Sequence, residues 1–188
     1  AGALTFSLSQ NIEAKIADRE TGDLRKVKVL DNLATSGSYN FVADSLQLSD
    51  FQTRAFTNLF DRVNVNVNAT HTAYARDSLT GGVVDSYLAS QGGGLVRLKR
   101  MTGAVGTSFQ SSSNAATPWN LRLDYNLNLA RQWAPELSRD TSAVTHATSA
   151  HGSVNLMKRY KVDVTTGYDV ARGEFTPTNL NLYVDLHC

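Results

Sequence analysis

The sequence reads Val63-Asn64-Val65-Asn66-Val67-Asn68-Ala69-Thr70 at the centre of its most regular segment. Apolar residues alternate there with asparagine and threonine at an unbroken two-residue period. Because successive side chains of a β-strand point to opposite faces of the sheet, this segment predicts a strand with one apolar and one hydrogen-bonding face. The same alternation recurs along nearly the whole sequence and predicts an all-β protein.

Composition excludes several classes of function. The chain has 188 residues, 18 basic and 17 acidic, and a formal net charge of +1, so it offers no basic field for nucleic acid. No window holds the roughly 18 consecutive apolar residues that a transmembrane helix needs. The single cysteine, Cys188, permits neither a disulfide within one chain nor a cysteine metal site, and we expect no cofactor.

Alternation predicts about ten strands, most of them joined by short turns, in an antiparallel up-and-down meander. The cleanest strands suit the tilted membrane strands of about 9–11 residues found in outer-membrane barrels. The predicted strands are Leu4–Ile16, Lys26–Ala43, Phe51–Phe60, Val63–Arg76, Ser86–Leu95, Met101–Phe109, Trp119–Leu129, Ala143–Leu156, Tyr160–Val170 and Thr178–Cys188.

The connections reveal an inconsistency in this count. Asp61-Arg62 and Met157–Arg159 are both predicted tight turns of the periplasmic kind, yet ten strands place them at opposite ends of a barrel. One strand is therefore miscounted. The two weakest segments are Ser86–Leu95, which contains Gly92-Gly93-Gly94, and Ala143–Leu156. Arg131–Asp140 is predicted as a loop.

Alternation alone does not say which face is outside, because a soluble lipocalin-like barrel has similar strand spacing. Three features favour lipid outside: charge-free apolar faces, polar faces rich in Asn, Ser and Thr, and aromatic residues near strand ends. Those aromatic residues are Phe60, Tyr74, Phe109, Trp119, Tyr160 and Phe175. The predicted lipid-facing residues are Val63, Val65, Val67, Leu121, Leu123, Leu127, Val162, Val164, Leu180 and Leu182. The predicted lumen-facing residues are Asn64, Asn66, Asn68, Arg122, Asp124, Asn126, Lys161, Asp163, Asp185 and His187.

Several short stretches carry a resemblance to a known family. They are Val27–Leu33, Ser38–Phe41, Ala43–Leu46, Arg54–Asp61, Gly167–Asp169, Glu174–Thr176 and Tyr183–Cys188. In this order, over about residues 10–188, they resemble the barrel of the LptD-like lipopolysaccharide-assembly proteins of Bacteroidetes-type bacteria. The barrel of that family is larger, so the resemblance implies that residues 1–188 are a consecutive block of barrel strands or a reduced relative.

The resemblance also implies a function and partners. It implies a non-enzymatic protein in the outer membrane of a Gram-negative bacterium that helps place lipopolysaccharide in the outer leaflet. The sugar-phosphate head would cross a wet lumen while the acyl chains leave between strands. The implied partners are membrane lipid, lipopolysaccharide, a lipoprotein plug and periplasmic bridge proteins.

The charged residues and the histidines allow other functions. Charged residues of the polar face would line the lumen, or would only pair with one another across strands and keep the interior hydrated. The histidines His71, His146, His151 and His187 do not share one strand parity and indicate no metal site. Asp185 and His187 alone resemble the Asp–His couple of a small barrel hydrolase. That hydrolase, a general outer-membrane pore and a soluble carrier are the alternatives.

Overall fold

The structure is a computed structural model that describes residues 2–17, 24–112, 114–156 and 159–185. It contains twelve strands and two short 3-10 helices, neither of which is long and apolar enough to cross a membrane. The elements are β1 (Ala3–Ala17), β2 (Leu24–Asn40), β3 (Phe51–Leu59), β4 (Val63–Thr72), β5 (Tyr74–Arg76), β6 (Val83–Tyr87), η1 (Leu88–Gln91), β7 (Arg97–Gln110), β8 (Trp119–Ala134), η2 (Pro135–Leu137), β9 (Arg139–Leu156), β10 (Tyr160–Asp169), β11 (Glu174–Phe175) and β12 (Asn179–Val184).

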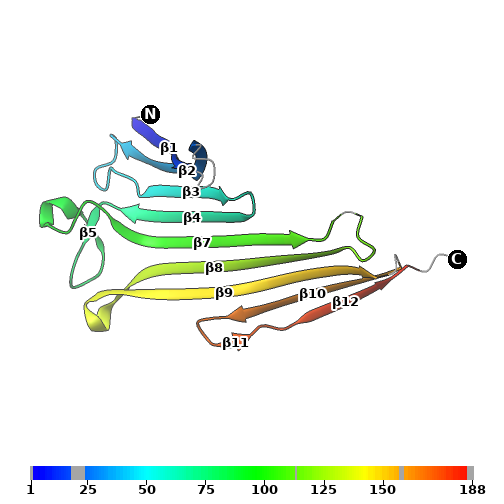
Figure 1. The fold of residues 1–188 in the computed structure, drawn as a ribbon. Helices are drawn as coiled ribbons and strands as arrows, with labels where there is room; N and C mark the ends of the chain where they lie inside the picture. Colours follow the sequence, from blue (N-terminus) through cyan, green and yellow to red (C-terminus); the bar gives the residue numbers. More distant parts are fainter. Residues whose placement is uncertain (1, 18–23, 113, 157–158, 186–188) are drawn as a thin grey trace.

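The predicted antiparallel meander is confirmed. Strands β1, β2, β3, β4, β7, β8, β9 and β10 follow one another across a single sheet, which we call the wall (Figure 1). The free side of β10 pairs with β11 and β12 in turn. Within the described residues β1 pairs only with β2, and β12 only with β10, so the wall is an open sheet with two edges.

The prediction of a strand over Ser86–Leu95 is wrong. Only β6 and η1 form there, and β6 pairs with β5 in a separate two-stranded sheet. β4 therefore lies directly beside β7, and the 73–96 segment is a folded loop between them. Removing this strand from the count places the Leu59–Val63 and Leu156–Tyr160 ends of their strand pairs at the same end of the wall, which resolves the inconsistency.

Two further boundaries differ from the prediction. β8 and β9 stay paired out to Ala134 and Arg139, so the predicted loop Arg131–Asp140 is mostly sheet, with η2 as its turn. The β3–β4 turn centres on Phe60 and Asp61, both at φ 56°. Positive φ at both central residues is the type I′ turn geometry, which matches the twist of the flanking strands.

The connections divide the wall into two ends. At the long-loop end lie segments 41–50, 73–96, 135–138 and 170–173. At the short-turn end lie segments 60–62 and 111–118 and the connection from β9 to β10. The two longest connections, 41–50 and 73–96, both lie at the long-loop end, and outer-membrane barrels likewise have their longer loops on one side.

The wall has almost no core. Among the described residues, the only buried apolar side chains are Ala73, Tyr74 and Ala75, all in the folded loop. The chain exposes 13631 Å² of surface, whereas a compact monomer of this size exposes about 8,800 Å². Both faces of a single sheet are therefore open.

Candidate functional site: the two faces of the wall

Strand register keeps the polar side chains on one face of the wall. Residues directly opposite each other in neighbouring strands point the same way. One continuous row runs from β4 to β10. In it Asn66 pairs with Ala104, Ala104 with Asn126, Asn126 with Ala147, and Ala147 with Asp169. From β4 to β12 this polar face carries nine asparagines: Asn64, Asn66, Asn68, Asn120, Asn126, Asn128, Asn155, Asn179 and Asn181.

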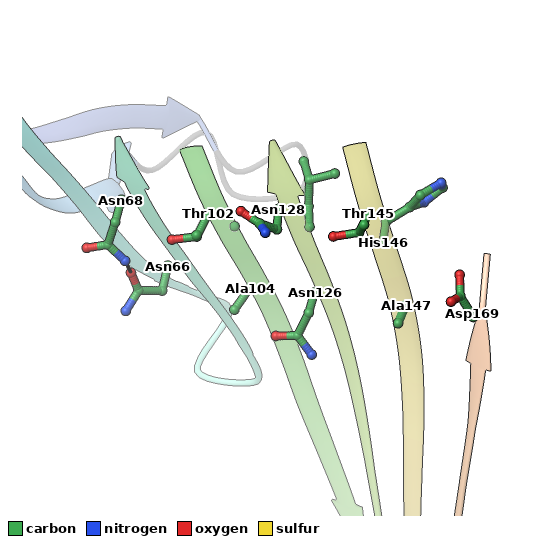
Figure 2. A pocket seen from close by; sticks show the side chains of 12 residues that line it. Asn66, Asn68, Thr102, Ala104, Asn126, Asn128, Thr145, His146, Ala147 and Asp169 are labelled. Atoms are coloured by element: carbon green, nitrogen blue, oxygen red, sulfur yellow. Dashed lines mark hydrogen bonds between the residues drawn. The ribbon is translucent and has the colours of Figure 1, made fainter. Parts of the chain in front are cut away.

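The polar face is hollowed at its centre, and Figure 2 shows the side chains around the hollow. Asparagines alternate there with small residues, because Ala104 separates Asn66 from Asn126. The hollow has a volume of about 550 Å³. Asn68 Nδ2 donates to Asn66 Oδ1 at 3.0 Å, which orients both amides. Apart from Asp169 at its edge, which lies 3.7 Å from Arg172 Nε, the hollow is lined by neutral residues that include hydrogen-bond donors and acceptors.

Two ion pairs of the polar face form within single strands, β8 and β10, and not between neighbouring strands. Arg122 Nε lies 2.8 Å from Asp124 Oδ2, and Arg122 Nη2 lies 3.0 Å from Asp124 Oδ1. Lys161 Nζ lies 3.1 Å from Asp163 Oδ2. Residues two apart in a strand share a face, so the two members of each pair lie within reach of each other. The polar face therefore remains nearly neutral.

The other face is apolar. One row on this face runs through Val65, Val105, Tyr125, Thr148 and Tyr168, each paired with the next on the neighbouring strand. No Asp, Glu, Lys or Arg lies on the described part of this face from β4 to β12. The ranges considered are 63–69 in β4, 101–109 in β7, 119–129 in β8, 144–154 in β9, 160–168 in β10 and 180–184 in β12. All ten residues predicted to face lipid lie here: Val63, Val65, Val67, Leu121, Leu123, Leu127, Val162, Val164, Leu180 and Leu182.

The predicted polar set lies opposite. Asn64, Asn66, Asn68, Arg122, Asp124, Asn126, Lys161 and Asp163 all occupy the polar face. Asp185 follows β12, where its N–H donates to the Arg159 carbonyl at 2.9 Å. His187 lies outside the described residues, as do Leu186 and Cys188, so the Asp185–His187 couple stays a prediction.

Aromatic residues border the apolar face at the short-turn end. Phe109, Trp119 and Tyr160 are all exposed on that face, where β7, β8 and β10 end or begin. Phe175 is exposed beside Tyr168 toward the opposite end. Tyr74 differs, because it is buried in the folded loop and stacks on Tyr87. Five of the six aromatic residues singled out in the sequence are exposed, and Tyr74 is not.

The histidines do not gather. His146 lies on the apolar face, where its Nδ1 is 3.2 Å from the Tyr125 hydroxyl. His151 lies on the polar face, 3.2 Å from the Thr165 hydroxyl. In the part of the chain that the structure describes, no three His, Cys, Asp or Glu side chains are grouped to hold a metal ion.

Sequence reasoning missed a cluster at the long-loop end. Asp140 Oδ1 lies 2.6 Å from Arg76 Nη1, and Asp140 Oδ2 lies 3.3 Å from Arg97 Nη1. The Arg76 guanidinium lies over the Trp133 ring, 5.9 Å from its centre. A Cβ at Gly81 would lie 2.1 Å from Trp133 Cδ1, so the loop tip packs closely on that ring. We call Arg76, Arg97, Trp133 and Asp140 the loop cluster. They are far apart in sequence and share no motif.

Hydrogen bonds fix the same loop to the β2–β3 connection and to itself. The Tyr74 hydroxyl accepts from Leu48 N at 2.8 Å, and Asp85 accepts from Leu46 N at 3.1 Å. Asp77 accepts from the backbone N–H groups of Leu79 and Thr80, and these two bonds lower the pKa of its carboxyl below the usual value.

Comparison with protein families gives one match in the first part of the chain. Residues 1–74, which include β1 to β4, match a family described as LptD protein. The resemblance to LptD is thereby confirmed for this part of the chain. Neither the curated proteins nor the solved structures include a match.

Proposed function

We propose that the wall is part of a transmembrane β-barrel of the LptD kind in a Gram-negative outer membrane. Its apolar face contacts acyl chains and its polar face borders a water-filled lumen. The observation that carries this proposal is the open sheet with one charge-free apolar face and one asparagine-rich face. In water the apolar face would remain exposed to solvent, and each Å² of exposed apolar surface would raise the free energy by about 25 cal/mol.

The apolar face has the height of a bilayer core. Trp119 and Leu129 are separated by ten residues of β8, which extend about 34 Å along the strand. At the tilt of about 40° that is usual in membrane barrels, this length spans about 26 Å. The apolar band of such barrels is about 25 Å tall, and Trp119 then lies at one interface, where aromatic side chains are enriched.

The role within the membrane follows from the family match and the polar face. The match at residues 1–74 relates the chain to lipopolysaccharide transport. We propose that the neutral amides around the central hollow hydrogen-bond the sugar hydroxyls of lipopolysaccharide during passage to the outer leaflet. This role requires no bond-making step, so the protein is proposed to be non-enzymatic. A lipoprotein plug and periplasmic bridge proteins are the proposed partners.

The open edges at β1 and β12 fit a wall that is completed by further strands. A membrane sheet must satisfy every backbone N–H and C=O group, because lipid offers no hydrogen bonds. We therefore propose that residues 1–188 are one block of a larger barrel.

Site-directed spin labelling tests the orientation of the faces. In a Cys188→Ser background of the native protein in lipid bilayers, single cysteines replace Leu123 or Asn126 and carry a nitroxide. We expect the label at 123 to be relaxed mainly by oxygen, which partitions into lipid, and the label at 126 mainly by a water-soluble nickel chelate. Leu79, an exposed leucine in the folded loop, is the matched control and should respond to nickel. Equal nickel accessibility at 123 and 126 would contradict the proposal.

Photo-crosslinking separates lipopolysaccharide transport from a general pore. A photoreactive residue at Asn126 or Asn66 should capture lipopolysaccharide in cells, whereas one at Leu79 should not. Ion conductance across a bilayer without any lipopolysaccharide capture at the polar face would favour the general pore.

A further inference from the structure

The loop cluster carries more positive than negative charge. Arg76 and Arg97 share Asp140, and Arg131 lies two residues before Trp133 on the same face of β8, where its charge acts on Arg97. Three guanidinium groups and one carboxylate leave a local charge of +2. The other carboxylate that acts on Arg97 belongs to Asp50, which is already paired with Lys99. The Arg76 and Arg97 side chains are only 16% and 15% exposed, so water screens this charge weakly.

The same cluster contains unpartnered hydrogen-bond donors. Arg76 Nε, Arg97 Nη2 and Trp133 Nε1 are buried and have no hydrogen-bond partner in the protein. Buried polar groups in folded proteins nearly always have one. Asp140 contacts one terminal nitrogen of each arginine, Arg76 Nη1 and Arg97 Nη1, and these contacts leave Arg76 Nε and Arg97 Nη2 without a partner. All three unpartnered atoms are donors, so their complement is an acceptor.

We propose that the loop cluster is a binding site for a phosphate group. A phosphate offers several acceptor oxygens and carries a charge of about −1.5 to −2 near neutral pH, which balances the local +2. The planar guanidinium fork matches phosphate geometry better than a lysine ammonium does. Arg131 is exposed and marks the side from which the phosphate enters. The phosphate belongs to a lipid headgroup or to a free anion. The proposal stands on the loop alone and does not depend on what the wall encloses.

The fluorescence emission of Trp133 can report whether phosphate is bound at the loop cluster. Replacing Trp119 by Phe leaves Trp133 as the one tryptophan, because the chain contains two. Inorganic phosphate is titrated into the native protein in zwitterionic micelles at constant ionic strength, and the Trp133 emission is followed. A second arm replaces inorganic phosphate with phosphatidic acid mixed into the micelles, with phosphatidylcholine alone as its blank. Circular dichroism confirms that each variant is folded.

We expect a saturable change in Trp133 emission in at least one arm. Arg131→Gln, an exposed and therefore tolerated change, should raise the half-saturation concentration about tenfold, as expected for the loss of one charge-assisted contact. Arg172→Gln removes an exposed arginine at the same end of the wall and should leave the titration unchanged. Saturation with inorganic phosphate identifies a free anion, and saturation with phosphatidic acid alone identifies a headgroup. No saturation in either arm, or identical titrations for the wild type and Arg131→Gln, would overturn the proposal.

Discussion

Replacing Asp140 by Asn should release the folded loop while leaving the wall intact. The carboxylate is the shared partner of two largely enclosed guanidinium groups, at 2.6 Å from Arg76 and 3.3 Å from Arg97. Removing one partner of a fully buried ion pair costs about 3–5 kcal/mol. The three side chains here are 15–23% exposed, so we expect about 3 kcal/mol, the lower end of that range.

Amide hydrogen exchange measures this cost locally. The loop is closed by hydrogen bonds from Leu88 N to Ala73 O and from Gly81 N to Asp77 O. A loss of about 3 kcal/mol should speed exchange of these two amides by roughly a hundredfold, because 1.4 kcal/mol is a factor of ten. Amides of Val65 and Leu123 in the wall should keep their protection, since their partners lie on neighbouring strands.

A matched control separates this effect from general loss of charge. Asp124→Asn removes a carboxylate whose partner, Arg122, is 67% exposed, and such pairs contribute little. Loop exchange should not change in that variant. Unchanged exchange of the loop in Asp140→Asn, or equal acceleration in the loop and the wall, would refute the view that this ion cluster holds the loop.

Three further predictions concern the loop and the two faces. Gly81→Ala should shift the Trp133 emission in a Trp119→Phe background, because Gly81 has φ +69° and its new Cβ would overlap the ring; an unchanged spectrum would contradict the contact. The hydrogen bonds accepted by the Asp77 carboxylate should stabilise the 77–82 turn fully above the unfolded pKa of about 3.9 and weaken as pH falls through the lowered folded pKa. Acid should therefore open this turn in NMR spectra of the wild type. The same pH change should not open the turn in Asp77→Asn. Leu123→Arg should destabilise the protein in bilayers by about 2–4 kcal/mol, as measured by denaturant unfolding, whereas Asn126→Arg on the polar face should have a much smaller effect.

Local alternation predicted the wall well, because a two-residue period encodes strand conformation without reference to distant residues. The strands around Val63, Trp119 and Tyr160 formed as expected, and their register put the predicted apolar and polar sets on opposite faces. The failure over Ser86–Leu95 has a physical cause as well. The segment Val83–Tyr87 does form a strand, but it pairs with β5 instead of joining the wall.

The sequence by itself determined that the chain is all-β, antiparallel and two-faced, because each strand carries its own apolar and polar side at neighbouring positions. Only the tertiary structure decided that β4 lies beside β7, that the charges pair along strands, and that the 73–96 segment folds into a charged cluster with Trp133 and Asp140. Those outcomes depend on contacts between residues up to 64 positions apart, such as Arg76 and Asp140, and no local period in the sequence encodes them.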